Sequence, residues 1–214
     1  MPIVQPDGYL AVPPSGNGRP VLLLHAWWGL NDTLRGVCDR LAAAGFVAFA
    51  PDLYHGKVAD TIADAEALGS ALDSNFLQAK AEIAEATMFL VDRAGDANRG
   101  VAVIGFSLGA YYALDLAAAD PDHIDSVVLF YGTGGGDFSH SKAAYLGHFA
   151  AQDEYEPPTN VDELELALRN AGHSVEFHSY PDAGHWFFEP DRVQAFNPDA
   201  ASLAWARTLA FLHS

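Results

Sequence analysis

The stretch Gly105-Phe106-Ser107-Leu108-Gly109 decides the fold of this chain, because of what lies on either side of it. The apolar run before it, residues 101–104, is typical of a buried strand, and the apolar run after it, residues 110–119, is typical of a buried helix. A serine in so tight a turn has a strained backbone, and its hydroxyl lies at the helix N-terminus, where negative charge is favoured. The pattern predicts that Ser107 is a nucleophile.

Strand and helix patterns alternate along the rest of the chain. Short apolar runs predict strands over residues 20–25, 46–50, 101–104, 127–131, 145–150 and 175–180. Helical spacing of apolar residues predicts helices over residues 32–44, 76–90, 110–119, 160–171 and 200–212. Such alternation is typical of a largely parallel sheet with helices on both faces. We therefore predict an α/β fold in one domain, residues 1–214, without a cap domain, because residues 132–144 are too few to form one.

Two helix starts carry capping signals. Asp32 is placed to cap the helix over residues 32–44, which Gly45 would end. Asn160, with Glu163 three residues later, resembles a capping box at the start of another helix.

Composition narrows the class of protein. Half of the 214 residues are hydrophobic, which is enough for one well-buried domain. The formal net charge of -17 argues against nucleic acid or an anionic membrane as a partner and is typical of a solvated acidic surface. The apolar run over residues 21–30 is too short to span a bilayer, and the first eight residues lack the features of a signal peptide. We therefore expect a soluble cytoplasmic protein.

Cys38 is the only cysteine, which excludes an intramolecular disulfide and a cysteine metal cluster. It shares the helical spacing of Leu34, Val37 and Leu41. We therefore expect Cys38 to pack in the core rather than to act as a nucleophile.

A serine nucleophile needs a base. The turn described above is the nucleophile elbow of the α/β-hydrolase fold, in which the acid and then the histidine follow the serine along the chain. Of the nine histidines, His185 lies in a glycine-bearing loop after the last predicted strand, where a base would be presented to the site. His25 ends a strand and is expected to organise a loop, while His148 falls within a strand. The order predicts His185 as the base.

The orienting acid is expected at the end of a strand. Asp153 follows the strand over residues 145–150, where its carboxylate can accept from imidazole Nδ1 and hold the required tautomer. Glu154 and Glu156 are close rivals in sequence. Asp182 is near His185, but an acid there is more often a turn residue. Asp153 is the predicted acid, and the three others are its alternatives.

An oxyanion hole requires two N–H groups aimed at the developing charge. One is expected from Leu108, directly after the nucleophile, and the other from the loop over residues 25–31, which follows the first predicted strand. The adjacent tryptophans of this loop, Trp27 and Trp28, either pack in the core or form the wall of a substrate pocket.

Several blocks of sequence, spread over about residues 20–190, carry a family resemblance. They are His25-Ala-Trp-Trp-Gly-Leu-Asn31, Pro51-Asp-Leu-Tyr54, Gly105-Phe-Ser-Leu-Gly109, Gly147-His-Phe-Ala-Ala-Gln-Asp153 and Tyr180-Pro-Asp-Ala-Gly-His185. In order and spacing these blocks resemble the dienelactone hydrolase family. The resemblance implies an α/β-hydrolase fold without a cap domain, no cofactor, and cleavage of small esters or lactones. It also implies that the second oxyanion N–H is that of Trp27.

The chain departs from that family at three positions. Dienelactone hydrolases carry cysteine in the elbow and a glutamate after the loop histidine, whereas this chain has Ser107 and Ala26. A serine must lose its proton to a base during attack, so both departures fit a Ser-His-Asp hydrolase. The family also binds a substrate carboxylate with arginines, and one of those positions is Glu189 here. Dienelactone itself is therefore not the expected substrate.

Aromatic residues within or near these blocks are candidates for the walls of the substrate pocket, although each could equally belong to the core. They are Trp27, Trp28, Tyr54, Tyr155, Trp186 and Phe187. Glu189 is expected at the same pocket, where it would disfavour an anionic substrate.

The resulting prediction is a serine hydrolase that cleaves small, mostly neutral carboxylic esters or lactones through an acyl-enzyme on Ser107. No cofactor and no metal are expected. One alternative is acyl transfer to an alcohol or a peroxide at the same site. The other is a non-catalytic binding protein that keeps the fold, against which Ser107, Asp153 and His185 argue.

Overall fold

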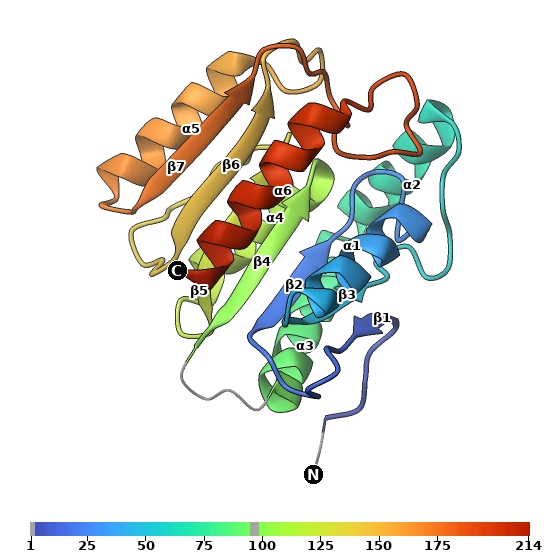
Figure 1. Cartoon of the computed structure of the whole chain (residues 1–214), viewed down its shortest axis with the longest axis vertical. Coiled ribbons are helices and arrows are strands. Elements are labelled where there is room, and N and C mark those ends of the chain that lie inside the picture. Colours follow the sequence, from blue (N-terminus) through green and yellow to red (C-terminus); the bar gives the residue numbers. More distant parts are fainter. Residues whose placement is uncertain (1–2, 95–98) are drawn as a thin grey trace.

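A central β-sheet organises the molecule (Figure 1). Within residues 3–94 and 99–214, which the computed structural model describes, seven strands form this sheet in the order β1-β3-β2-β4-β5-β6-β7. The strands are β1 (Gly8–Ala11), β2 (Pro20–Leu24), β3 (Val47–Pro51), β4 (Val101–Phe106), β5 (Ile124–Phe130), β6 (Ala144–Ala150) and β7 (Val175–Tyr180). Neighbouring strands are parallel, except that β1 pairs with β3 in the antiparallel direction.

Helices cover both faces of the sheet and form most of the connections between its parallel strands. They are α1 (Asp32–Ala43), α2 (Ile62–Ser74), α3 (Phe76–Ala94), α4 (Leu108–Ala119), α5 (Pro158–Asn170) and α6 (Pro198–His213). The helices α1 and α6 pack on one face, and α3, α4 and α5 pack on the other (Figure 1). Among the described residues, no helix is both long and apolar enough to cross a membrane.

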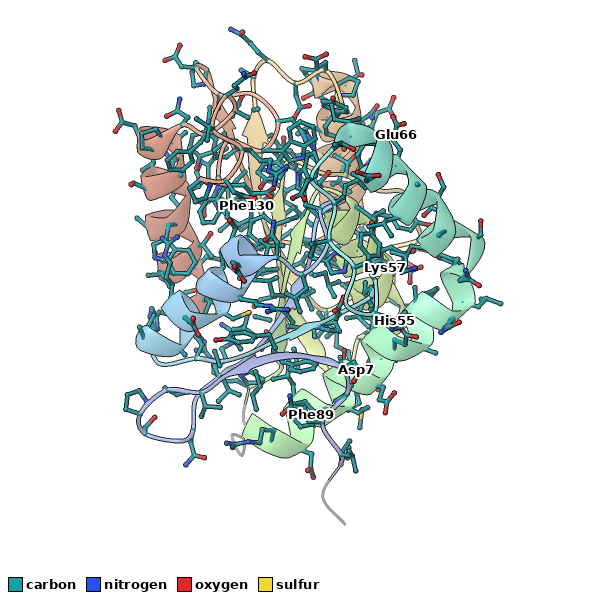
Figure 2. All side chains as sticks on the ribbon, turned by 90° about the vertical axis from the view of Figure 1, so that its right-hand side faces the viewer. Asp7, His55, Lys57, Glu66, Phe89 and Phe130 are labelled. Carbon is teal, nitrogen blue, oxygen red and sulfur yellow. The ribbon has the colours of Figure 1, made fainter. Side chains whose placement is uncertain are left out.

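Strand β2 shows how the sheet separates two cores. Val21 and Leu23 belong to the core under α1 and α6, while Leu22 and Leu24 belong to the core under α3, α4 and α5. Successive side chains of a strand point to opposite faces, so a strand covered on both sides must be apolar throughout. Figure 2 shows the sheet between its two helix layers, with Phe130 on the α6 side.

The carboxyl ends of the parallel strands bring the predicted site residues to one edge of the sheet. Ser107 directly follows β4, Asp153 comes shortly after β6, and His185 comes shortly after β7. Trp27 lies in the loop after β2. In open parallel sheets this edge is where ligands bind.

The structure confirms the predicted α/β architecture, and every predicted strand and helix has a counterpart within a few residues. The connection from β5 to β6, residues 131–143, contains no helix or strand and so holds no cap domain. Two elements, β1 and α2, lie outside the predicted set.

Both predicted caps are wrong in position. The side chain that caps α1 is Asn31, which accepts from the Leu34 N–H at 3.1 Å, and Asp32 is already helical. Asn160 lies inside α5, which begins at Pro158 without a side-chain cap. Proline suits the first turn of a helix because its φ is already helical and no N–H is lost there, so α5 starts ahead of the expected capping box.

Candidate active site

Ser107 occupies the tight turn between β4 and α4. Its φ of 49° lies in the left-handed region, which residues other than glycine rarely adopt. Its N–H donates to the Phe130 carbonyl at 2.9 Å, and its carbonyl accepts from the Ala110 N–H at 2.8 Å. Such a backbone costs about 1–3 kcal/mol and persists only where the surrounding structure imposes it, which is common at active sites.

Gly109 lets this turn approach the loop that follows β2. A Cβ atom at residue 109 would collide with the carbonyl oxygens of Leu24 and His25. The close approach of two backbones therefore requires glycine at this position. As a result, the turn that holds Ser107 and the loop over residues 25–31 are in direct contact.

Ser107, His185 and Asp153 form a continuous series of hydrogen bonds. Ser107 Oγ lies 2.9 Å from His185 Nε2, and His185 Nδ1 lies 2.9 and 2.8 Å from the two carboxylate oxygens of Asp153. The side chains of His185 and Asp153 are only 5% and 1% exposed, so their hydrogen bond is shielded from water and thereby strengthened. In this arrangement the imidazole can accept the serine proton while the carboxylate holds its orientation.

Asp153 is the acid that contacts His185, and its rivals are placed differently. Two backbone N–H groups of its own loop, both at 2.9 Å, also fix the carboxylate of Asp153. Glu156 instead accepts from the N–H and the hydroxyl of Thr133, at 2.8 and 2.9 Å. Glu154 and Asp182 are exposed. The geometry therefore favours Asp153 as the orienting acid.

Two further buried histidines have their own partners. His25 Nδ1 lies 2.8 Å from the carbonyl oxygen of Ala26, so the ring is tied to the loop after β2. His148 lies between the hydroxyls of Tyr180 and Thr208, at 2.9 and 3.0 Å. Burial lowers the pKa of both imidazoles below the usual value, and far below it for His148. Both rings are therefore neutral residues within the fold.

The backbone N–H groups of Leu108 and Trp27 are placed on adjoining segments. Leu108 is the first residue of α4, and the first N–H groups of a helix have no partner inside it. Among the described residues, neither N–H donates to a protein acceptor. Both residues are partly exposed, and their N–H groups are therefore candidates for binding an oxygen atom of a ligand.

Two partly exposed aromatic rings, those of Tyr155 and Trp186, lie beside His185, and the partly exposed ring of Trp27 lies beside Tyr155. The Tyr155 ring lies 5.2 Å from the His185 ring and is 42% exposed. The rings of Trp186 and Trp27 lie 4.8 and 6.2 Å from that of Tyr155. Such a surface suits the apolar part of a small ligand.

The other expected pocket residues lie below the surface. Trp28, Tyr54, Phe187 and Glu189 are each at most 5% exposed. Trp28, for example, packs edge-on against Trp186 with ring centroids 5.1 Å apart. As folded, Trp28, Tyr54 and Phe187 are buried, which fits the alternative that they belong to the core, and Glu189, which was expected at the pocket, is buried as well.

A buried pair, Tyr131 and Glu189, lies behind His185. The Tyr131 hydroxyl donates to Glu189 Oε1 at 2.7 Å, and the Tyr131 ring lies 5.0 Å from the His185 ring. Glu189 Oε2 has no partner among the described residues. Burial raises the pKa of Glu189 to about 8, so this carboxyl is protonated at neutral pH. Sequence reasoning missed the pair because a glutamate in a loop gives no sign that it is buried.

We expect the buried Glu189 carboxyl to make the protein less stable as pH rises. Glu189 keeps its proton to about pH 8 in the folded state but has a reference pKa of 4.5. Between these values the folded state holds one more proton than the unfolded chain, so rising pH favours unfolding. The contribution is on the order of a few kcal/mol across this window.

Urea denaturation of wild type and Glu189→Gln at pH values from 5 to 8 measures this effect. The free energy of unfolding of the wild type should fall more steeply with pH than that of Glu189→Gln, which cannot titrate at this position. Parallel curves for the two proteins would contradict the assignment of a protonated carboxyl.

Cys38 is the other side chain that could act as a nucleophile, but it is buried. The Cys38 side chain is fully buried on α1, and burial raises the pKa of its thiol to about 12. A thiol that stays protonated at neutral pH is a poor nucleophile. In the part of the chain that the structure describes, no three His, Cys, Asp or Glu side chains are grouped to hold a metal ion.

Comparisons with known proteins agree along nearly the whole chain. Residues 7–214 match the sequence model of the dienelactone hydrolase family. The chain is 34% identical to "Protein usf" of Aquifex pyrophilus and 29% identical to a "Putative carboxymethylenebutenolidase" of Aquifex aeolicus, in each case over 97% of this chain and 93% of the relative. A solved structure described as a "Putative Dienelactone Hydrolase" from Klebsiella pneumoniae superposes with a TM-score of 0.81 at 27% identity, covering 95% of this chain and 90% of the other.

Proposed function

Because the chain belongs to the dienelactone hydrolase family and is an ester or lactone hydrolase of that family, we propose a serine mechanism on small, neutral substrates. The reaction takes place in a single domain and proceeds through an acyl-enzyme on Ser107. The hydrogen-bonded series from Ser107 through His185 to Asp153 is the observation that carries this proposal.

In this mechanism Ser107 Oγ attacks the carbonyl carbon of the substrate while His185 Nε2 accepts the hydroxyl proton. Asp153 keeps the other imidazole nitrogen protonated and stabilises the positive charge that forms. The imidazolium then gives its proton to the leaving alcohol. A water molecule, deprotonated by the same histidine, releases the acyl group and restores the serine.

The oxyanion formed during attack is bound by the N–H groups of Leu108 and Trp27. Preformed donors of this kind need no reorganisation during the reaction, and one such donor is typically worth about 3 kcal/mol in the transition state. The positive end of the α4 dipole adds to the same effect. Support comes from the position of Leu108 at the first turn of α4 and from the contact of the two loops at Gly109.

The preference for a neutral substrate follows from what occupies the positions near His185 where a substrate carboxylate would be bound. The residue four positions after His185 is Glu189, where the family has an arginine for a substrate carboxylate, and its side chain is buried. Arg192, the next cation along this loop, pairs with Asp191 at 2.8 Å and stacks on the Trp28 ring at 4.0 Å. An anionic substrate would also approach a protein of net charge -17.

Hydrolysis of a panel of p-nitrophenyl esters and lactones, together with labelling by a fluorophosphonate, tests the proposed function. We expect turnover of short acyl esters and stoichiometric labelling at Ser107. Product analysis with added alcohol or hydrogen peroxide separates hydrolysis from acyl transfer. A protein that neither turns over any ester nor reacts with the probe would be a non-catalytic member of the family.

A matched pair of substrates tests the charge preference. At low salt, a neutral p-nitrophenyl ester should have a kcat/KM roughly tenfold above that of its carboxylate-bearing analogue of equal length, because like charges repel. The ratio should shrink towards one at high salt, where the field is screened, and this measurement is the internal control. Faster hydrolysis of the carboxylate analogue at low salt would overturn the expectation.

A further inference from the structure

Tyr131 stands at the junction of the nucleophile turn and the base. It follows β5 directly, next to Phe130, whose carbonyl holds the Ser107 N–H. A Cβ atom at the following residue, Gly132, would collide with the carbonyl oxygen of Ser107. Tyr131 itself has a φ of 38°, an uncommon value that turns the chain across the end of the sheet. The backbone at Tyr131 is therefore packed against the nucleophile.

The side chain of Tyr131 reaches the loop that carries the base. Its ring lies 5.0 Å from the His185 ring and 5.5 Å from the Phe187 ring, and the residue is fully buried. Its hydroxyl donates to Glu189 Oε1 at 2.7 Å. One tyrosine therefore contacts the imidazole with its ring and holds the same loop with its hydroxyl.

Glu189 lies one turn after the base. The Glu189 N–H donates to the Trp186 carbonyl at 3.0 Å, and Trp186 has a φ of 64°. This turn closes the segment that begins at His185. Because the turn is short, the position of the Glu189 carboxyl restricts where the His185 ring can lie.

The buried carboxyl of Glu189 is energetically unfavourable compared with apolar packing. Burying a polar group with an unpaired oxygen, such as Glu189 Oε2, costs free energy that an apolar side chain of similar size would not. Apolar rings surround the partner of this carboxyl, since those of Phe106 and Phe187 lie 6.1 and 5.5 Å from the ring of Tyr131. Unlike apolar packing, the hydrogen bond between Tyr131 and Glu189 holds the two side chains in one orientation.

We propose that Tyr131 and Glu189 are positioning residues, whose hydrogen bond fixes the His185 imidazole at the distance from Ser107 that proton transfer requires. The proposal rests on the proposed function, since it assigns the pair to the base of that mechanism. Both side chains are fully buried, so we expect neither to contact the substrate. Loss of the bond should therefore lower kcat and leave KM nearly unchanged.

Two variants remove the hydrogen bond without opening a large cavity. Tyr131→Phe removes the donor, and Glu189→Leu removes the acceptor. Because small displacements of a catalytic group cost up to about 100-fold in rate, we expect each variant to lower kcat by roughly 10- to 100-fold, with KM within about threefold of wild type. Glu189→Gln keeps an oxygen acceptor and should retain at least about a third of the wild-type kcat.

Tyr145→Phe is the matched control. Tyr145 is also a fully buried tyrosine, and its hydroxyl is bonded to that of Ser141 at 2.7 Å. It lies at the start of β6, at the end of the strand away from Asp153. The same chemical change should leave kcat within about twofold of wild type, even if it lowers the melting temperature as much as Tyr131→Phe does.

Steady-state kinetics on a p-nitrophenyl ester and the rate of fluorophosphonate labelling at Ser107 are measured for all five proteins, with circular dichroism to confirm folding. Losses in kcat and in labelling rate that are confined to Tyr131→Phe and Glu189→Leu support the proposal. Folded variants with the kcat of Tyr145→Phe would overturn it, as would failure of both variants to fold, which would make the pair purely structural. A wild type that shows neither turnover nor labelling would refute the proposed function itself, and this inference with it.

Discussion

Replacing Ser107 by alanine is expected to lower kcat for ester hydrolysis by about 10,000-fold or more. In the proposed mechanism this change removes the atom that attacks the carbonyl, so an acyl-enzyme can no longer form. Alanine carries the same Cβ as serine, so the φ of 49° at residue 107 should be no more strained in the variant than in the wild type. The free energy of unfolding should therefore change by less than about 1 kcal/mol.

The measurement is kcat on a short p-nitrophenyl ester, with urea denaturation to show that the variant is folded. Cys38→Ala is the control, because Cys38 is the other side chain that could attack a carbonyl and its thiol is buried, with a pKa of about 12. Its kcat should stay within a few-fold of wild type. Loss of turnover in Cys38→Ala but not in Ser107→Ala would reverse the assignment of the nucleophile.

Replacing Asp153 by asparagine is expected to lower kcat by about 10,000-fold. Both carboxylate oxygens of Asp153 lie within 2.9 Å of His185 Nδ1, so the carboxylate keeps the proton on that nitrogen. An asparagine amide can donate to Nδ1 and so stabilise the opposite tautomer, in which Nε2 carries the proton and cannot accept one from Ser107. Little of the loss should appear in KM, since Asp153 does not contact the substrate.

Asp182→Asn is the matched control for this variant. Asp182 is closer to His185 in sequence than Asp153 is, but its side chain is exposed, and its backbone carbonyl makes the contact with Asn197. The same chemical change there should leave kcat within about twofold of wild type. Full activity in Asp153→Asn, or a large loss of kcat in Asp182→Asn, would contradict the assignment of Asp153 as the acid that orients His185.

The strands and helices of the two cores could be predicted because burial imposes a pattern on them. Strands such as β2 and β4 are apolar throughout, since both of their faces are covered. The edge strand β1 is only four residues long and half exposed, and α2 buries small residues such as Ala65 and Gly69, so neither has a strong apolar period. Both elements are fixed by their neighbours: Gly69, for instance, faces the Trp27 indole.

That Ser107, Asp153 and His185 lie close together could also be predicted, because the carboxyl ends of parallel strands meet at one edge of the sheet. How deeply a loop side chain is buried could not be predicted. Glu189 was expected at the pocket surface, yet the turn after His185 directs it inward to Tyr131. Sequence gives the charge of such a residue but not the direction of its side chain, which depends on the φ of Trp186 and on the space behind it.

Because Cys38 is buried, chemical modification of its thiol can be used to measure local opening of the fold. The Cys38 side chain lies between α1 and the sheet and is completely inaccessible to solvent, so a thiol reagent can reach it only when α1 separates from β1 and β3. Since Cys38 is the only cysteine, the rate of modification by an excess of thiol reagent depends only on the opening that exposes this side chain. Compared with the unfolding free energy from urea, that rate shows whether α1 detaches alone or only when the whole sheet unfolds.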